Sequence, residues 1–241
     1  MTRRATVLGL ALAACLAGCG KAGQPIVVSA ASSLNQALPA YELNARYTFG
    51  GSDQLAAQIR KGLRPDVYAA ANTTLPQQLF RERLVEKPVF IATNKLVIAV
   101  PARSHKIRSI DDLARPGVKI AVGAPSNPVG SYARQALARL PKAKARAIER
   151  NIRSNEPDVG GVIAKISNDS VDAGFVYFTD VKAAHGRVRA IQLPASLRPT
   201  IVYAAAVVKG SKHHDDAVNY IRGLVHAPSM RRAGFGPPPT T

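Results

Sequence analysis

The fold is decided by residues 25–70, which read PIVVSAASSLNQALPAYELNARYTFGGSDQLAAQIRKGLRPDVYAA. Short runs rich in β-branched, aromatic and small apolar residues predict strands at 25–30, 47–49 and 66–70. Between these strands, Ser32-Ser33 and Gly50-Gly51-Ser52-Asp53 each precede apolar residues at helical spacing, which predicts two helix starts. Strands that alternate with helices are typical of a parallel sheet, so the segment predicts an α/β fold.

The same alternation continues downstream of this segment. Further strands are expected at 95–100, 118–122, 173–178 and 200–208. Further helices are expected at 132–140, 159–167 and 215–226. The sequence has no internal repeat with a period of 20–50 residues, which argues against a solenoid.

Two long apolar runs, 95–100 and 201–208, bracket a middle segment that has its own alternating units. This arrangement predicts two lobes joined by two crossings of the chain, with the first lobe discontinuous in sequence. The first lobe is expected to combine 26–99 with 202–236, and the second to span 100–201. The last residues, 237–241, have no periodicity and are expected to form a frayed tail.

The N-terminus has the pattern of an export signal. Two arginines precede an apolar segment, Val7–Gly18, which is too short to span a bilayer as a helix. The segment ends in Leu16-Ala17-Gly18-Cys19, which resembles the lipobox of bacterial lipoproteins. That resemblance implies a signal peptide at 1–18, lipidation of Cys19, and an extracytoplasmic chain anchored to the membrane. An ordinary secretory signal with a chance cysteine is the alternative.

The charge of the chain is strongly basic. Lys and Arg number 33 against 15 Asp and Glu, a net charge of +18, and this balance indicates an anionic partner. Aromatic residues make up only 5% and Trp is absent, which disfavours a stacking platform for single-stranded nucleic acid. The densest basic stretch, 134–153, is therefore interpreted as a solvated lobe face. An exported protein that binds nucleic acid or another polyanion through this stretch remains the alternative from a different class.

Catalytic and metal-binding signatures are scarce in the sequence. The motifs of serine hydrolases, dinucleotide-binding folds, P-loops and zinc proteases are missing. His213-His214-Asp215-Asp216 is a candidate cation cluster, but adjacent side chains on a helix diverge around its axis. A solvated helix start explains it better. We therefore expect neither an enzyme nor a bound metal cation.

A more specific signal lies in the turns that follow the predicted strands. Four segments where a helix begins contain neither Lys nor Arg, namely 30–35, 50–54, 124–132 and 156–162. The start of a helix presents unpaired N–H groups and the positive end of its dipole, which together attract anions. Ser33 and Ser52 add hydroxyl donors at two of these starts. The pattern predicts an anion held by neutral groups, with the cationic side chains elsewhere.

At these residues the chain resembles the periplasmic molybdate-binding proteins of bacterial ABC transporters. The stretches that carry the resemblance are 28–34 (VSAASSL), 49–55 (FGGSDQL), 65–68 (PDVY), 95–101 (KLVIAVP), 112–133 (from DLARPGV to YA), 158–161 (DVGG) and 174–177 (GFVY). The resemblance implies the type II periplasmic-binding-protein fold. In that fold two lobes, each a mostly parallel sheet flanked by helices, are joined by a double crossover hinge.

The resemblance also implies a ligand and its contacts. Molybdate or tungstate would be bound through its oxygens by the hydroxyls of Ser33 and Ser52, the N–H groups of Val129 and Val159, and the phenol of Tyr177. No further cofactor is implied, and a membrane permease would be the protein partner of a monomeric chain. Asp53, the neighbour of Ser52, is expected to turn outward at the start of its helix.

The protonation of the ligand separates the oxyanion alternatives. Molybdate and tungstate are fully deprotonated at neutral pH, so a pocket of donors alone suits them. Hydrogen phosphate needs at least one acceptor, and leaving its proton unpaired would cost about 1–3 kcal/mol. Sulfate also needs donors only but is smaller, so the size of the pocket must exclude it. Sulfate and phosphate remain the alternatives within this class.

Overall fold

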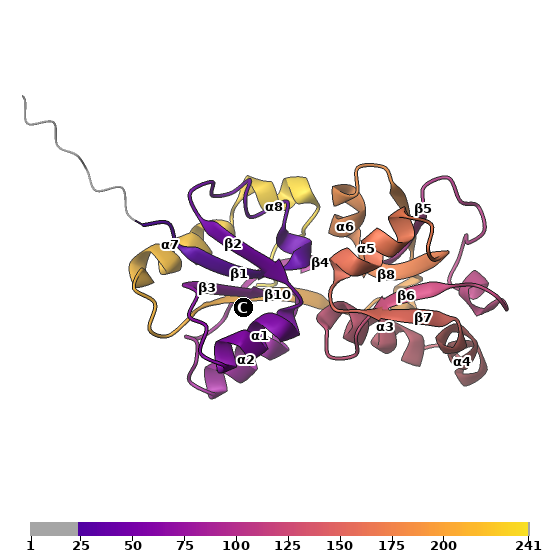
Figure 1. Ribbon diagram of the computed structural model, residues 1–241, viewed down its shortest axis with the longest axis horizontal. Coiled ribbons are helices and arrows are strands. Elements are labelled where there is room, and N and C mark those ends of the chain that lie inside the picture. The colour runs from indigo at the N-terminus through magenta and orange to yellow at the C-terminus, as the bar shows by residue number, and fades with distance from the viewer. Residues whose placement is uncertain (1–23, 241) are drawn as a thin grey trace, which may run out of the picture.

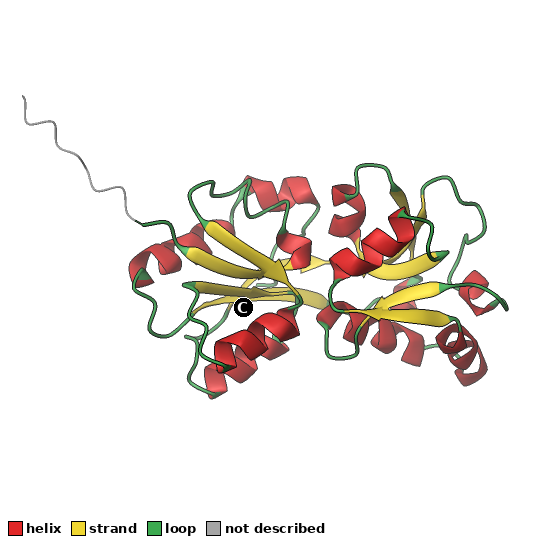
Figure 2. Ribbon diagram, viewed as in Figure 1, coloured by secondary structure: helices red, strands yellow, loops and turns green. Residues whose placement is uncertain are grey.

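The computed structural model describes residues 24–240 (Figure 1). The predicted signal peptide at 1–18 and the lipidation site at Cys19 lie outside the described residues. The described chain forms two lobes, each built on one five-stranded sheet. Helices lie on both faces of each sheet (Figure 2). None of the helices between residues 24 and 240 combines the length and apolar character that crossing a bilayer requires.

The sheet of the first lobe has the strand order β2-β1-β3-β10-β4. These strands are β1 (Val27–Ala31), β2 (Arg46–Gly50), β3 (Val67–Ala70), β4 (Val89–Asn94) and β10 (Ile201–Val207). β1 pairs in parallel with β2 and β3, whereas β10 is antiparallel to both of its neighbours. The helices of this lobe are α1 (Ser52–Arg60), α2 (Thr74–Arg81), α7 (His214–Leu224) and α8 (Pro228–Ala233), with a 3-10 turn at Ser32–Leu34.

The sheet of the second lobe repeats this plan in the order β7-β6-β8-β5-β9. Its strands are β5 (Leu96–Pro101), β6 (Ile120–Gly123), β7 (Ile152–Glu156), β8 (Ala173–Tyr177) and β9 (Val188–Gln192). Its helices are α3 (Pro128–Ala138), α4 (Lys142–Arg150), α5 (Val159–Ser167) and α6 (Phe178–Ala183), with 3-10 turns at Asp111–Ala114 and Ala195–Leu197. β5 is antiparallel to both of its neighbours. In each lobe the antiparallel strand is the one that the chain enters directly from the other lobe.

The first crossing lies earlier than the sequence predicted. β4 ends at Asn94 in the first sheet, and β5 begins at Leu96 in the second. The expected boundary between 99 and 100 therefore falls inside a strand of the second lobe, and residues 96–99 were assigned to the wrong sheet. A strand buried on both faces is a continuous apolar run in either lobe, so its composition does not show which sheet it joins. The return crossing ends where β10 begins, at Ile201.

The C-terminal segment stays bonded to the first lobe beyond the point at which its composition predicts fraying. Gly234 adopts a left-handed conformation (φ 100°) that ends α8, and Phe235 is buried. Gly236 exchanges two backbone hydrogen bonds with Thr93 of β4, and the Thr93 hydroxyl donates to the Pro237 carbonyl (3.0 Å). The chain is therefore attached to the first sheet as far as Pro237, the first residue of the expected frayed tail.

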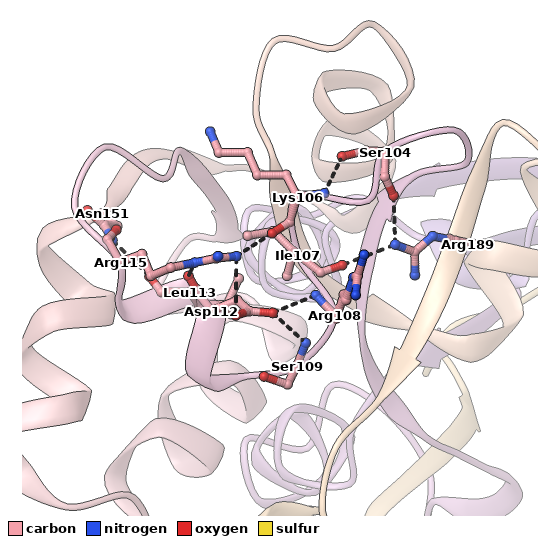
Figure 3. Close-up of polar contacts among 10 residues, drawn as sticks. All are labelled: Ser104, Lys106, Ile107, Arg108, Ser109, Asp112, Leu113, Arg115, Asn151 and Arg189. Carbon is pink, nitrogen blue, oxygen red and sulfur yellow. Dashed lines mark hydrogen bonds and ion pairs between the residues drawn. The ribbon is translucent and has the colours of Figure 1, made fainter.

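Several arginines of the second lobe have structural roles around the loop that follows β5 (Figure 3). Arg189 donates to the carbonyls of Ser104 (2.7 Å) and Ile107 (3.0 Å). Arg115 donates through its guanidinium to the Lys106 carbonyl, and Asp112 accepts the backbone N–H of Arg108 (2.7 Å). The guanidinium groups of Arg189 and Arg115 thus fix the backbone of this loop.

Candidate anion site between the lobes

A small cavity lies where the two lobes meet. The first lobe lines it with Ala31, Ser32, Ser33, Gly50, Gly51, Ser52 and Ala71, and the second with Asn127, Asp158, Val159 and Tyr177. Of these lining residues none is Lys or Arg. Four of the five residues predicted to bind the ligand, Ser33, Ser52, Val159 and Tyr177, are therefore brought together around one space.

The Ser33 hydroxyl is oriented by a buried polar chain. Its Oγ lies 2.8 Å from the phenol oxygen of Tyr203. The Asn94 amide donates to that phenol oxygen (3.3 Å) and to the Thr179 hydroxyl (2.9 Å). Either hydroxyl of the Ser33–Tyr203 pair can be the donor. In the arrangement in which Tyr203 donates to Ser33, the hydrogen of Ser33 is available to a ligand in the cavity.

Ser52 is oriented in the same way by the backbone. It is the first residue of α1, is only 1% exposed, and its Oγ accepts the N–H of Ala71 (3.1 Å). The residue before it, Gly51, has no side chain that could cap the helix. The first turn of α1 and the hydroxyl hydrogen of Ser52 therefore both offer donors to the cavity.

The hydroxyl of Tyr177 is buried at the cavity. Its side chain is 1% exposed at the end of β8, and no hydrogen-bond partner for its oxygen is found among residues 24–240. Its ring packs edge-to-face on Tyr203 of the first lobe, with the centroids 5.7 Å apart. Burial raises the pKa of Tyr177 well above its ordinary value, so the phenol stays protonated and can donate. Burying an unpaired hydroxyl costs about 1–3 kcal/mol, which a ligand oxygen at this position would recover.

Two further helices begin at this cavity. Val159 is the first residue of α5, and the preceding Asp158 caps the helix by accepting the N–H of Gly161 (3.0 Å). Val129 is buried in the first turn of α3 and is not among the lining residues, and its N–H donates to the side chain of Asn127 (3.2 Å). Asn127, the residue before α3, lines the cavity.

Asn127 and Asp53 were not identified as site residues from the sequence. An Asn directly before Pro128 is a typical helix N-cap, and this signal predicts the position of Asn127 but not its exposure to the cavity. Asp53 was expected to turn outward. Instead its carboxylate accepts hydrogen bonds from Ser126 and Asn127 of the second lobe. Its helix begins at the cleft, so a side chain that turns outward from the first turn faces the other lobe.

The fold agrees with comparisons to known proteins. The model of the bacterial extracellular solute-binding protein family matches residues 21–235. The chain belongs to this family. Its described part has the two-lobed architecture of a periplasmic binding protein, as the sequence predicted.

Particular relatives of this solute-binding protein bind oxyanions. The molybdate-binding protein ModA of Mycobacterium tuberculosis is 32% identical over 236 residues, which cover 92% of this chain and 88% of the relative. The periplasmic molybdate-binding protein of Azotobacter vinelandii superposes with a TM-score of 0.77 at 20% identity, over 89% of this chain and all of that one. The sulfate-binding protein SubI of M. tuberculosis gives 0.75 at 19% identity, over 89% and 87%. The two structural matches establish the fold.

The other candidate groups of this solute-binding protein are dispersed. His213 contacts Asp66 (3.2 Å), whereas His214 contacts Glu86 (2.9 Å) and Asp215 (3.0 Å). Within the described range no three His, Cys, Asp or Glu residues are grouped as they would be to hold a metal ion. In the basic stretch 134–153, Arg134 donates to the Gly123 and Gly130 carbonyls and Lys144 pairs with Asp111 (2.7 Å).

A buried carboxyl lies behind the anion site of this solute-binding protein. Asp180, in the first turn of α6, accepts the N–H of Tyr177 (2.9 Å). Burial raises the pKa of Asp180 to about 8, and the negative charge of Asp158 acts in the same direction. At neutral pH the carboxyl is mostly protonated and adds little negative charge near the cavity. Asp180 was not predicted as a site residue, although an acid three residues after a strand end is a common capping pattern.

Proposed function

We propose that this solute-binding protein captures molybdate or tungstate between its lobes and delivers it to an ABC permease. The observation that carries the proposal is the Tyr177 hydroxyl, which is buried, protonated and without a partner among residues 24–240, in a cavity lined by two oriented serines. The similarity to ModA of M. tuberculosis supports the choice of ligand. The protein binds and releases its ligand unchanged, and so acts in transport and not as an enzyme.

The donors at the cavity favour a fully deprotonated oxyanion. Where Tyr203 donates to Ser33, the hydroxyls of Ser33 and Ser52 have their oxygens engaged by Tyr203 and Ala71, which leaves their hydrogens for the ligand. The Tyr177 phenol and the start of α5 add two more donors. Asp158 turns one carboxylate oxygen to the Gly161 N–H. The neutral donors suit molybdate and tungstate. The second carboxylate oxygen of Asp158, which also lines the cavity, is an acceptor that hydrogen phosphate would need, so the preference over phosphate is proposed from the similarity to ModA.

Sulfate is the second candidate ligand, because it too needs donors only. The similarity to SubI establishes a common fold but not a common ligand. Molybdate and tungstate are larger than sulfate and almost equal to each other in size and charge. Molybdate and tungstate are therefore expected to bind with similar affinity, and the similarity to ModA of M. tuberculosis supports the expectation that sulfate binds more weakly.

The remaining features concern delivery. Closure of the lobes on the ligand would present a joint surface of both lobes to the permease, and opening would release the anion. The lipobox ending in Cys19 supports attachment to the outer face of the membrane by a lipid, with the chain acting as a monomer. The first strand, β1, begins at Val27, eight positions after Cys19, so the first lobe would be held close to the membrane.

A single substitution tests the role of the phenol. In Tyr177→Phe the ring and its packing on Tyr203 are retained, while the unpaired hydroxyl is removed. We expect the dissociation constant for molybdate to rise about 10- to 100-fold, because a hydrogen bond to a charged group is lost. The melting temperature of the ligand-free protein should stay the same or rise. Calorimetric titration and thermal unfolding measure the two quantities, and unchanged affinity would contradict the proposal.

The buried carboxyl predicts a dependence on pH. A dianion in the cavity disfavours ionisation of Asp180, so binding takes up protons as the pH rises through the pKa of about 8. We expect the affinity for molybdate to fall between pH 7.5 and 9.5, and Asp180→Asn to flatten that profile. Titrations across this range test it. The same decline in Asp180→Asn as in the wild type would contradict the role of this group.

The raised pKa of Asp180 also predicts how the stability of the ligand-free protein depends on pH. Its pKa is raised from 3.8 to about 8 in the folded protein, so between these values the folded chain binds more protons than the unfolded chain. Stability therefore falls as the pH rises through this window. Asp180→Asn removes this contribution. The difference in melting temperature, variant minus wild type, should therefore increase as the pH rises from 5 to 8.

A further inference from the structure

The carboxylate of Asp53, in the first lobe, is hydrogen-bonded to residues of the second lobe. Asp53 follows Ser52 in the first turn of α1, in the first lobe. Its Oδ2 accepts a hydrogen bond from the Ser126 hydroxyl (2.7 Å), and its Oδ1 accepts one from the Asn127 amide (3.2 Å). Both donors directly precede α3 in the second lobe. Each carboxylate oxygen of Asp53 is thus used by the opposite lobe.

Asn127 extends this contact to a third element. Its amide nitrogen also donates to the carbonyl of Pro157 (2.8 Å), in the turn before α5, and its oxygen accepts the N–H of Val129 (3.2 Å). The side chain is buried, with only 4% of the residue exposed. The starts of α1, α3 and α5 are therefore tied together through Asn127, at the edge of the anion cavity that it lines.

These contacts belong to the closed arrangement of the lobes. A Cβ atom on Gly51 would lie 2.6 Å from the Pro157 carbonyl oxygen and 2.8 Å from the Asn127 amide nitrogen. The backbones of the two lobes are thus in direct contact beside Asp53. Any opening of the cleft at this point would break the hydrogen bonds of Asp53 to Ser126 and Asn127.

We propose that Asp53 is a positioning residue that clasps the two lobes in the closed state and slows the release of the bound oxyanion. A carboxylate beside an anion site repels the ligand, and this repulsion by itself would favour release. The hydrogen bonds from Ser126 and Asn127 are charge-assisted and form only when the lobes are closed, so they stabilise the closed state relative to the open one. In this proposal their stabilisation exceeds the repulsion between Asp53 and the ligand. The identity of the ligand rests on the proposed function, whereas the clasp itself rests on the geometry of the two lobes.

A purely local role makes a different prediction. Asp53 is also an acid in the first turn of a helix, where it stabilises the helix by its interaction with the dipole. In that case its removal would lower the stability of the first lobe and leave ligand release unchanged. Asp216 provides a matched control, because it is an acid in the first turn of α7 in the same lobe. Ser126→Ala provides a second probe, because it removes a donor to Asp53 and leaves α1 intact.

The dissociation rate of molybdate, followed by stopped-flow tyrosine fluorescence, is the first test. We expect Asp53→Ala to raise it about tenfold or more and Ser126→Ala to raise it severalfold, with association rates changed little. The double variant should be no faster than Asp53→Ala, and Asp216→Ala should match the wild type. Asp53→Asn keeps an acceptor and a donor at this position and should recover part of the loss. Dissociation from Asp53→Ala as slow as from the wild type would overturn the clasp.

Small-angle X-ray scattering of the ligand-free protein separates the clasp from the identity of the ligand. If the wild type fails to bind molybdate, the proposed function fails, and scattering then decides the clasp. A larger radius of gyration in both Asp53→Ala and Ser126→Ala than in the wild type and Asp216→Ala would support it. Equal radii in all four proteins would overturn it.

Discussion

Replacing both Ser33 and Ser52 by alanine is expected to abolish the rise in melting temperature that molybdate produces. Where Tyr203 donates to Ser33, each hydroxyl has its oxygen engaged within the protein, by Tyr203 or by the Ala71 N–H, and so directs its hydrogen to the cavity. Losing two hydrogen bonds to a charged ligand should weaken binding about 100-fold or more. Thermal unfolding with and without millimolar molybdate measures the effect.

The serine variants need two controls. The double variant must still unfold cooperatively, although Ser52→Ala leaves the buried N–H of Ala71 without its acceptor and should cost about 1–3 kcal/mol. Ser32→Ala is the matched control for position, because Ser32 also lines the cavity and is adjacent to Ser33. It should change the affinity less than threefold. A larger loss in Ser32→Ala than in Ser33→Ala would contradict the assignment.

Gly51→Ala is expected to abolish binding by a different route, by keeping the lobes apart. The added Cβ would lie 2.6 Å from the carbonyl oxygen of Pro157, which is backbone of the second lobe and cannot rotate away. The conformation of Gly51 (φ −62°, ψ 130°) suits alanine, so the first lobe should fold normally. Since affinity falls in proportion to the fraction of closed protein, we expect a loss of about 100-fold or more.

The neighbouring glycine supplies the control for this substitution. A Cβ on Gly50 would meet only the side chain of Leu55, at ordinary distances of 3.7 and 3.8 Å. Gly50→Ala should therefore bind molybdate nearly as the wild type does. Calorimetry gives both affinities, and thermal unfolding checks that each variant is folded. Binding by Gly51→Ala within threefold of the wild type would contradict the closed geometry of the cleft.

The parts of the fold that were predicted correctly are those with a local signal. The alternation of β-branched runs and helix starts in 25–70 gives β1, α1 and β3 within one or two residues of their observed bounds. By contrast, α2 and β4 were not identified, and β5 was assigned to the wrong lobe. The membership of a strand in one sheet or another depends on contacts distant in sequence, which composition does not encode.

The candidate site divides in the same way. Ser33, Ser52 and Val159 stand at helix starts after strands, and this local pattern brings them to the cavity. Asn127 and Asp53 act through contacts between the lobes: Asn127 donates to Asp53, 74 residues away, and Asp53 accepts from Ser126, 73 residues away. The high pKa of Asp180 arises from burial, which only the packed structure determines. Features that depend on how the two lobes pack against each other could therefore not be predicted from local sequence patterns.

Isothermal titration of the mature chain with molybdate, tungstate, sulfate and phosphate tests the central claim most directly. We expect one site per chain with a dissociation constant in the micromolar range or below for molybdate and for tungstate. Sulfate should bind at least tenfold more weakly, and phosphate should give no heat near neutral pH. Absence of heat with both molybdate and tungstate, or tighter binding of sulfate than of either, would contradict the account.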